Sequence, residues 1–192
     1  AARFCVEEEI RALQTVRDTM DRASFDKAVA LLSSANRVIT CASGSSGIAA
    51  KKFAHSLCCI ERAAQFLSPS EAVHGGLGCV QSGDAVVMVS RGGKTTELLQ
   101  ILDVVTKKGV KLVAVTENLS APLAQKADCV LAMHIAREGD PINAMATASF
   151  VATIAIFDAL LSALMVERGY TAKQFALIHP GGAVGERLNK KG

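Results

Sequence analysis

The chain has 192 residues, which is long enough for one domain that buries a sizeable core without disulfides. Half of the residues are apolar, only 4% are aromatic, and the formal net charge is +3. This small charge, with no dense Lys/Arg block and no aromatics interleaved with basic residues, argues against nucleic-acid binding. Aliphatic side chains must build the core, which suits helices packed on a buried sheet.

The six cysteines form no CxxC pair, and no histidine is spaced to complete a zinc site. We expect buried free thiols, and neither a metal nor a cofactor. The N-terminal segment is charged and amphipathic, unlike a signal peptide, and no apolar run reaches the roughly 18 residues of a membrane span. The sequence therefore predicts a soluble, cytoplasmic protein without a membrane partner.

In chain order, apolar residues at helical spacing predict an amphipathic helix over residues 3–21 and a shorter helix over 25–33. Short apolar runs at 37–42, 63–67, 84–90, 111–116 and 128–133 then predict strands. Helix-like periodicity lies between them at 48–60, 95–107 and 119–126. This alternation implies a three-layer α/β fold with a parallel sheet covered by helices on both faces.

The segment 144–168 is rich in Ala, Ile and Leu around most of its circumference, which predicts a helix buried in the domain or against another subunit. Gly169 is placed to cap it, and a short helix from Thr171 is expected to stop before His179. We expect residues 1–35 to be helices that pack on or between subunits, and residues 36–192 to form the α/β domain. Because the first helix and the apolar helix both require extra burial, we expect a homo-oligomer.

Two predicted strands end in small, hydroxyl-rich loops, SGSSG at 43–47 and SRGGKTT at 90–96. Each loop leads into a predicted helix, so free amides and the helix dipole favour an anion there. Ligands of open parallel sheets bind at the carboxyl ends of strands, so two such loops on neighbouring strands predict a phosphate site. The GKT at 93–95 is also how a nucleotide-binding P-loop ends, but Met88 stands where that motif needs glycine.

The chain resembles the sugar isomerase (SIS) domain of the arabinose 5-phosphate isomerase family from about residue 36 onward. The motifs that carry the resemblance are ASGSSG at 42–47, SPSEAVHGGLG at 68–78, SRGGKTTELL at 90–99, AREGDP at 136–141 and FALIHPGGAVGERL at 175–188. The resemblance implies a five-stranded parallel sheet of flavodoxin-like type, in dimers or, as we expect, tetramers with active sites at subunit interfaces. Many relatives continue into a pair of regulatory CBS modules; since this chain ends at Gly192, we expect it to lack them.

The resemblance also implies which residues form the site. Those expected to bind the substrate, through the two phosphate loops, are Ser45, Ser46, Ser90, Arg91, Gly93 and Thr95. Three polar site positions of the family are kept, at His74, Glu138 and His179, whereas four other positions carry a different residue. Ser45 replaces a family lysine and Ile48 a histidine, while Gly92 replaces a serine and Lys94 a glutamate.

Aldose–ketose isomerisation needs a base that moves a proton between C1 and C2, and an acid or cation that polarises the carbonyl. His74, Glu138 and His179 are the candidates for proton transfer. Lys94 is a candidate to stabilise the enediolate or to pair with the phosphate, as a relocated substitute for the family lysine. Each has a structural alternative: a turn hydrogen bond for His74, a surface charge for Glu138 and a helix cap for His179.

Three functional hypotheses remain. The first is a phosphosugar isomerase of the arabinose 5-phosphate type with altered specificity, and the second is a non-catalytic phosphosugar-binding sensor. The third, a P-loop nucleotidase, is disfavoured by Met88. The cations of Arg91 and Lys94 favour a more anionic ligand than a pentose phosphate, such as a sugar acid phosphate, an amino-sugar phosphate or a bisphosphate.

Overall fold

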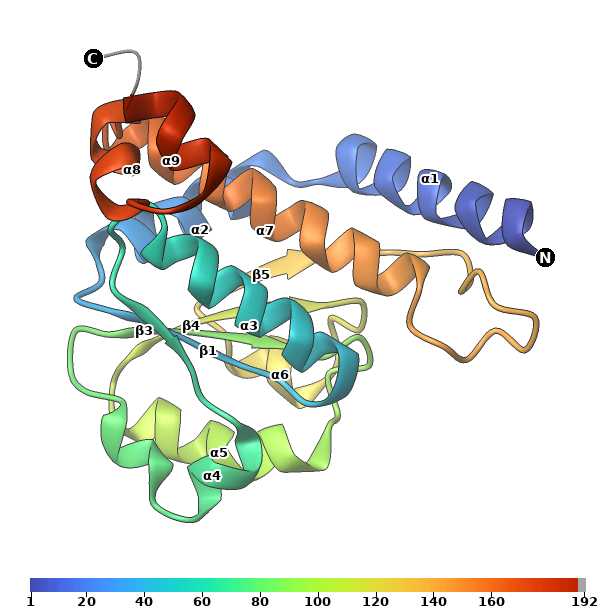
Figure 1. The fold of residues 1–192 in the computed structure, drawn as a ribbon. Helices are drawn as coiled ribbons and strands as arrows, with labels where there is room; N and C mark the ends of the chain where they lie inside the picture. Colours follow the sequence, from blue (N-terminus) through green and yellow to red (C-terminus); the bar gives the residue numbers. More distant parts are fainter. Residues whose placement is uncertain (190–192) are drawn as a thin grey trace.

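The computed structural model describes residues 1–189 as helices packed on both faces of one parallel sheet (Figure 1). All five predicted strands form, each within one residue of its expected ends. They are β1 Val38–Cys41, β2 Ala64–Phe66, β3 Ala85–Val89, β4 Lys111–Thr116 and β5 Cys129–Ala132. Their order, β2-β1-β3-β4-β5 with every pair parallel, is the flavodoxin-like order that the resemblance implied.

Alternate residues of the strands point to opposite faces of the sheet, and each face has its own core. Val87 and Val89 of β3 pack under α1 Ala2–Thr19, α2 Arg22–Ser34, α3 Gly44–Cys58 and α7 Ala148–Glu167. Val86 and Met88 pack under α4 Pro69–Val73, α5 Thr96–Lys107 and α6 Pro122–Lys126. Because both faces are covered, the strands appear in the sequence as continuous apolar runs rather than as alternating ones.

The apolar helix expected from residue 144 begins at Ala148 instead. The carboxylates of Glu138 and Asp140 accept hydrogen bonds from backbone amides between residues 142 and 149, which folds the preceding segment into a loop. α7 then packs against α1 and α3, where Phe157 stacks on Phe53 with ring centroids 4.3 Å apart. α7 is long and apolar enough to span a membrane by composition alone, but its buried face belongs to the core.

The N-terminal helix α1 lies along α7 (Figure 1). Ala12 and Val16 are buried, whereas Val6, Ile10 and Leu13 remain exposed. This exposed apolar face is what the homo-oligomer prediction requires, and the assembly stays a prediction.

Two elements near the C-terminus complete the described chain. Helix α8, Ala172–Ile178, begins with a capping box between Thr171 and Gln174 and ends before His179, as expected. Helix α9, Gly182–Asn189, was not predicted, because its glycine-rich sequence has low helix propensity.

The site is positioned by a reversal in the order of the strands. The chain leaves β1 toward β2 on one side and leaves β3 toward β4 on the other. The loops after β1 and β3 therefore diverge and leave a crevice at the carboxyl edge of the sheet. The expectation that the two hydroxyl-rich loops follow neighbouring strands is confirmed, because Cys41 and Met88 pair in register just before them.

Candidate functional site

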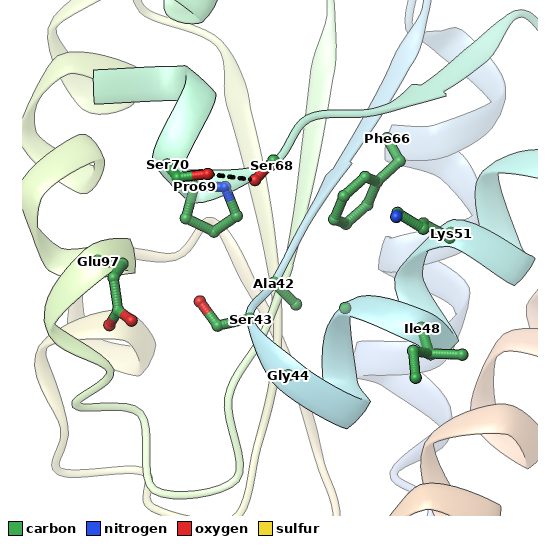
Figure 2. A pocket seen from close by; sticks show the side chains of 11 residues that line it. Ala42, Ser43, Gly44, Ile48, Lys51, Phe66, Ser68, Pro69, Ser70 and Glu97 are labelled. Carbon is green, nitrogen blue, oxygen red and sulfur yellow. Dashed lines mark hydrogen bonds between the residues drawn. The ribbon is translucent and has the colours of Figure 1, made fainter. Parts of the chain in front are cut away.

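A cavity of about 350 Å³ lies at this crevice (Figure 2). Such a volume is at the lower end of the roughly 300–1,000 Å³ of small-molecule sites. Its walls come from the first turns of α3, the end of β2, the start of α4 and the first turn of α5. The residues that line it are Ala42, Ser43, Gly44, Gly47, Ile48, Lys51, Phe66, Ser68, Pro69, Ser70 and Glu97.

The first loop carries open backbone donors in the helical turn that lines the cavity with Gly44 and Gly47. Ser43 is the N-cap residue of α3, but its side chain makes no capping hydrogen bond. Within the described residues, the amides of Gly44, Ser45 and Ser46 have no acceptor, since the first helical bond runs from the Gly47 amide to the Ser43 carbonyl at 3.0 Å. Open amides at the positive end of a helix dipole form an anion-binding surface.

The side chains of Ser45 and Ser46 do not line this cavity. With Arg91, Ser149 and other α7 residues they line a separate small hollow on the α7 side of the α3 first turn. The hydroxyl that this loop does place in the cavity is Ser43, which the sequence did not single out. The hydroxyls of Ser45 and Ser46 therefore do not reach the cavity, and the groups of these residues that are open to an anion are their backbone amides.

The second loop is held by its own polar side chains. The buried Ser90 hydroxyl lies 2.8 Å from the Thr95 hydroxyl and accepts the Gly93 amide at 3.0 Å. Gly93 has a φ of +65°, and a Cβ there would lie 2.6 Å from the Ala121 Cβ, so only glycine fits. These three predicted site residues therefore fix the shape of the loop that leads into α5.

Arg91 lies between two carboxylates from neighbouring strand ends. Its Nε donates to Glu117 at 2.8 Å and its Nη1 donates to Glu138 at 3.1 Å. The other Glu117 oxygen lies 2.7 Å from Nδ1 of His134. Because both carboxylates offset the guanidinium charge, Arg91 brings little net positive charge to a ligand. Glu117 and His134 were missed, although both follow strands whose carboxyl ends share this edge of the sheet.

Glu138 is not a surface charge, since only 3% of it is exposed. Beside Arg91, it accepts the amides of Thr147 at 3.0 Å and of Ser149 at 3.1 Å, and so caps the N-terminus of α7. Burial raises the pKa of this carboxyl, but the hydrogen bonds from Ser149 and Thr147 and the charge of Arg91 outweigh burial and hold the pKa below its ordinary value. Glu138 is therefore ionised, with each carboxylate oxygen already bonded.

Two other predicted residues lie outside the cavity lining. His74 is exposed at the C-terminal end of α4, where its amide bonds to the Glu71 carbonyl at 3.2 Å. Lys94 is exposed at the tip of the second loop. Neither is brought into contact with the cavity by the described chain.

His179 lies at the other end of α3. Its ring stacks on Phe175 with centroids 3.8 Å apart, and its Nδ1 lies 2.9 Å from the Phe175 carbonyl oxygen. The adjoining Tyr170 hydroxyl donates to the carbonyl of Cys59, just past the end of α3. The 15 residues of α3 span about 22 Å, and Figure 1 shows α8 at the end of α3 remote from Gly44. His179 therefore does not reach the cavity of its own chain.

Two charged residues line the cavity that the sequence did not single out. Lys51 lies one turn beyond Gly47 on α3, with its Nζ 5.1 Å from the centroid of the Phe66 ring. Glu97 comes from the first turn of α5, and Figure 2 shows it on the wall opposite Lys51 and Phe66, with Ser43 between. The signal for both was their place in the first two turns of helices that begin at the phosphate loops.

Comparisons with known proteins agree with this arrangement. The SIS domain profile matches residues 31–163. The arabinose 5-phosphate isomerase KdsD of Pseudomonas aeruginosa is 37% identical over 158 residues, which cover 82% of this chain and 48% of that protein. The chain spans about half the length of the curated relatives it matches.

Two solved structures share nearly the whole fold. A Listeria monocytogenes protein, described as a candidate sugar-phosphate isomerase, has a TM-score of 0.88 and 42% identity, covering 92% of this chain and 93% of that one. The c3406 protein of Escherichia coli CFT073, solved in complex with arabinose 5-phosphate, has a TM-score of 0.89 and 28% identity, covering 93% and 95%. With the profile match over most of its length, the chain belongs to the SIS domain family.

Proposed function

We propose that this protein is a phosphosugar isomerase that interconverts an aldose phosphate and a ketose phosphate. The observation that carries the proposal is the cavity at the crevice between β1 and β3, which is lined both by Glu97 and by the first turn of α3, where backbone amides are open. Relatives named arabinose 5-phosphate isomerases and a related structure holding arabinose 5-phosphate support the same substrate class.

Binding of the phosphate falls to the starts of the helices that surround the cavity. The amides of Gly44, Ser45 and Ser46 are open, and the α3 dipole adds partial positive charge. Ser43 and Ser68 line the cavity beside these amides and supply hydroxyl groups for a sugar. The site therefore suits a small, polar ligand with one strongly anionic group.

Proton transfer falls to Glu97. Isomerisation removes a proton from C2 of the aldose, passes through an enediolate, and returns a proton to C1 while the carbonyl moves to C2. The Glu97 carboxylate is exposed to the cavity, so it can accept this proton and return it. Glu138 is buried and bonded at both oxygens, so the proposal gives it the role of holding Arg91 and the start of α7 in place.

The remaining predicted residues have supporting roles in the proposal. Ser90, Gly93 and Thr95 hold the conformation of the second loop, which leads into the α5 turn that carries Glu97. His179 would act only in the cavity of a second copy, which makes the proposed homo-oligomer a condition for its catalytic role. His74 likewise stays a prediction.

A non-catalytic sensor is the second candidate, and one observation favours it. Neither Ser45 nor Lys94 places its side chain among the residues that line the cavity, so the expected relocation of an ammonium from position 45 to position 94 has no support. A sensor would bind a sugar phosphate in the same cavity and would not convert it.

The experiment that tests the proposal has two stages. Thermal melting with a panel of pentose and hexose phosphates, together with ATP, identifies the ligand class. NMR of the best stabilising sugar phosphate then follows conversion between aldose and ketose. Conversion supports the isomerase, and stabilisation without conversion supports the sensor. Stabilisation by ATP with none by any sugar phosphate would contradict both.

A further inference from the structure

The walls of the cavity carry an uneven distribution of charge. Among the described residues that line it, the cationic side chain is that of Lys51, and the acidic one is that of Glu97 on the opposite wall. Arg91 lines the separate hollow and is bonded to two carboxylates, and Lys94 is exposed outside the lining. An anionic ligand group in the cavity therefore meets one ammonium, that of Lys51.

The structure holds this ammonium at the rim of the cavity. Lys51 follows Gly47 by one helical turn, so it lies on the same face of α3 as the glycines whose backbone lines the cavity. Its Nζ lies 5.1 Å from the centroid of Phe66, which is itself a lining residue at the end of β2. The negative face of the ring attracts the ammonium and keeps it beside the opening.

Lys52, the next residue on α3, is oriented differently from Lys51. Lys52 is turned away from the cavity and forms an ion pair with Asp158 on α7. The two adjacent lysines of α3 thus have different partners. Lys52 is neutralised by Asp158, whereas the described chain provides no carboxylate partner for Lys51. Lys52 is accordingly a matched control for Lys51.

We propose that Lys51 is the residue whose side chain binds the phosphate of the ligand, next to the open amides of the α3 first turn. This inference rests on the proposed function, because it assigns a substrate contact within the same site. Glu97 repels the phosphate from the opposite wall, so the anionic end lies toward Lys51 and the carbonyl end toward Glu97. Lys51 contributes to substrate affinity and Glu97 to the chemical step.

Titration calorimetry with the best sugar phosphate of the panel, at low and high salt, tests the inference. A charge-assisted hydrogen bond to phosphate predicts that Lys51→Met binds about tenfold to hundredfold more weakly than the wild type. Lys51→Arg should retain most of the affinity, and Lys52→Met should bind like the wild type. The salt dependence should also be weaker in Lys51→Met, because one phosphate-binding charge is gone.

Kinetics and melting separate a binding role from a structural one. If turnover is detected, Lys51→Met should raise KM by a similar factor and leave kcat nearly unchanged. Melting of the unliganded variant should match that of Lys52→Met. Wild-type affinity in Lys51→Met overturns this inference and leaves the proposed function standing. Failure of the wild type to bind any sugar phosphate overturns the proposed function itself.

Discussion

Replacing Glu138 tests whether its carboxylate holds the start of α7 rather than exchanging protons. In Glu138→Ala the amides of Thr147 and Ser149 lose their acceptor, which is equivalent to removing a helix N-cap and costs about 1–2 kcal/mol. The ion pair with the partly exposed Arg91 adds up to about 1 kcal/mol. The free energy of unfolding should therefore fall by about 1–3 kcal/mol, and by about half of that in Glu138→Gln, which keeps one acceptor oxygen.

The stabilisation by the Glu138 carboxylate should depend on pH. Because the folded-state pKa of Glu138 is below its ordinary value of 4.5, the native state favours the ionised carboxylate. This stabilisation is complete above the ordinary pKa and is lost as the pH falls through the lower folded-state pKa. The gap between the wild type and Glu138→Gln should therefore be largest at neutral pH and shrink below about pH 4.

Urea denaturation at several pH values measures this gap. The exposed Glu7→Ala is a suitable control and should stay within about 0.5 kcal/mol of the wild type. If Glu138→Ala unfolds like the control, or the gap is the same at acidic and neutral pH, the carboxylate does not cap α7 in the way described.

Two further predictions concern the second loop. Gly93→Ala should lower the free energy of unfolding by about 2–3 kcal/mol, because the backbone has a left-handed φ and the new Cβ would clash with Ala121. Gly92→Ala is the control and should leave the melting temperature nearly unchanged, because its Cβ would meet open space. Equal melting temperatures of the two variants would refute the steric reason. Lys94→Ala should leave sugar-phosphate affinity and turnover within about threefold, since an exposed charge outside the cavity lining is screened by salt. A larger loss in calorimetry or NMR turnover would show that Lys94 reaches the ligand.

The layered fold could be predicted from the sequence because its signals are local. Continuous apolar runs marked all five strands. The helix predicted from residue 48 begins at Gly44, so most of the first hydroxyl-rich loop is the first turn of α3. The start of α7 could not be placed, because it depends on hydrogen bonds that the carboxylates of Glu138 and Asp140 accept from amides several residues away. The glycine-rich α9 likewise gave no propensity signal.

The site was predicted at the level of loops and not at that of side chains. Successive residues of a helix are rotated by about 100°, so a one-residue difference decides whether a side chain faces the cavity or α7. That rotation places Gly47 and Lys51 in the cavity lining and Ser45 outside it, whereas Ser43 precedes the helix as its extended N-cap residue. The pairing of Arg91 with Glu117 joins residues 26 positions apart, which no local pattern reports.

The most direct test is whether the protein moves a proton between adjacent sugar carbons through Glu97. NMR in D2O with arabinose 5-phosphate, or with another sugar phosphate that stabilises the protein, would follow deuterium entering at C1 or C2. The wild type should incorporate deuterium and form the other isomer, whereas Glu97→Gln should lose at least about a hundredfold in rate and keep its melting temperature. Tight binding by the wild type without exchange would contradict the isomerase, and full exchange in Glu97→Gln would contradict the role given to Glu97.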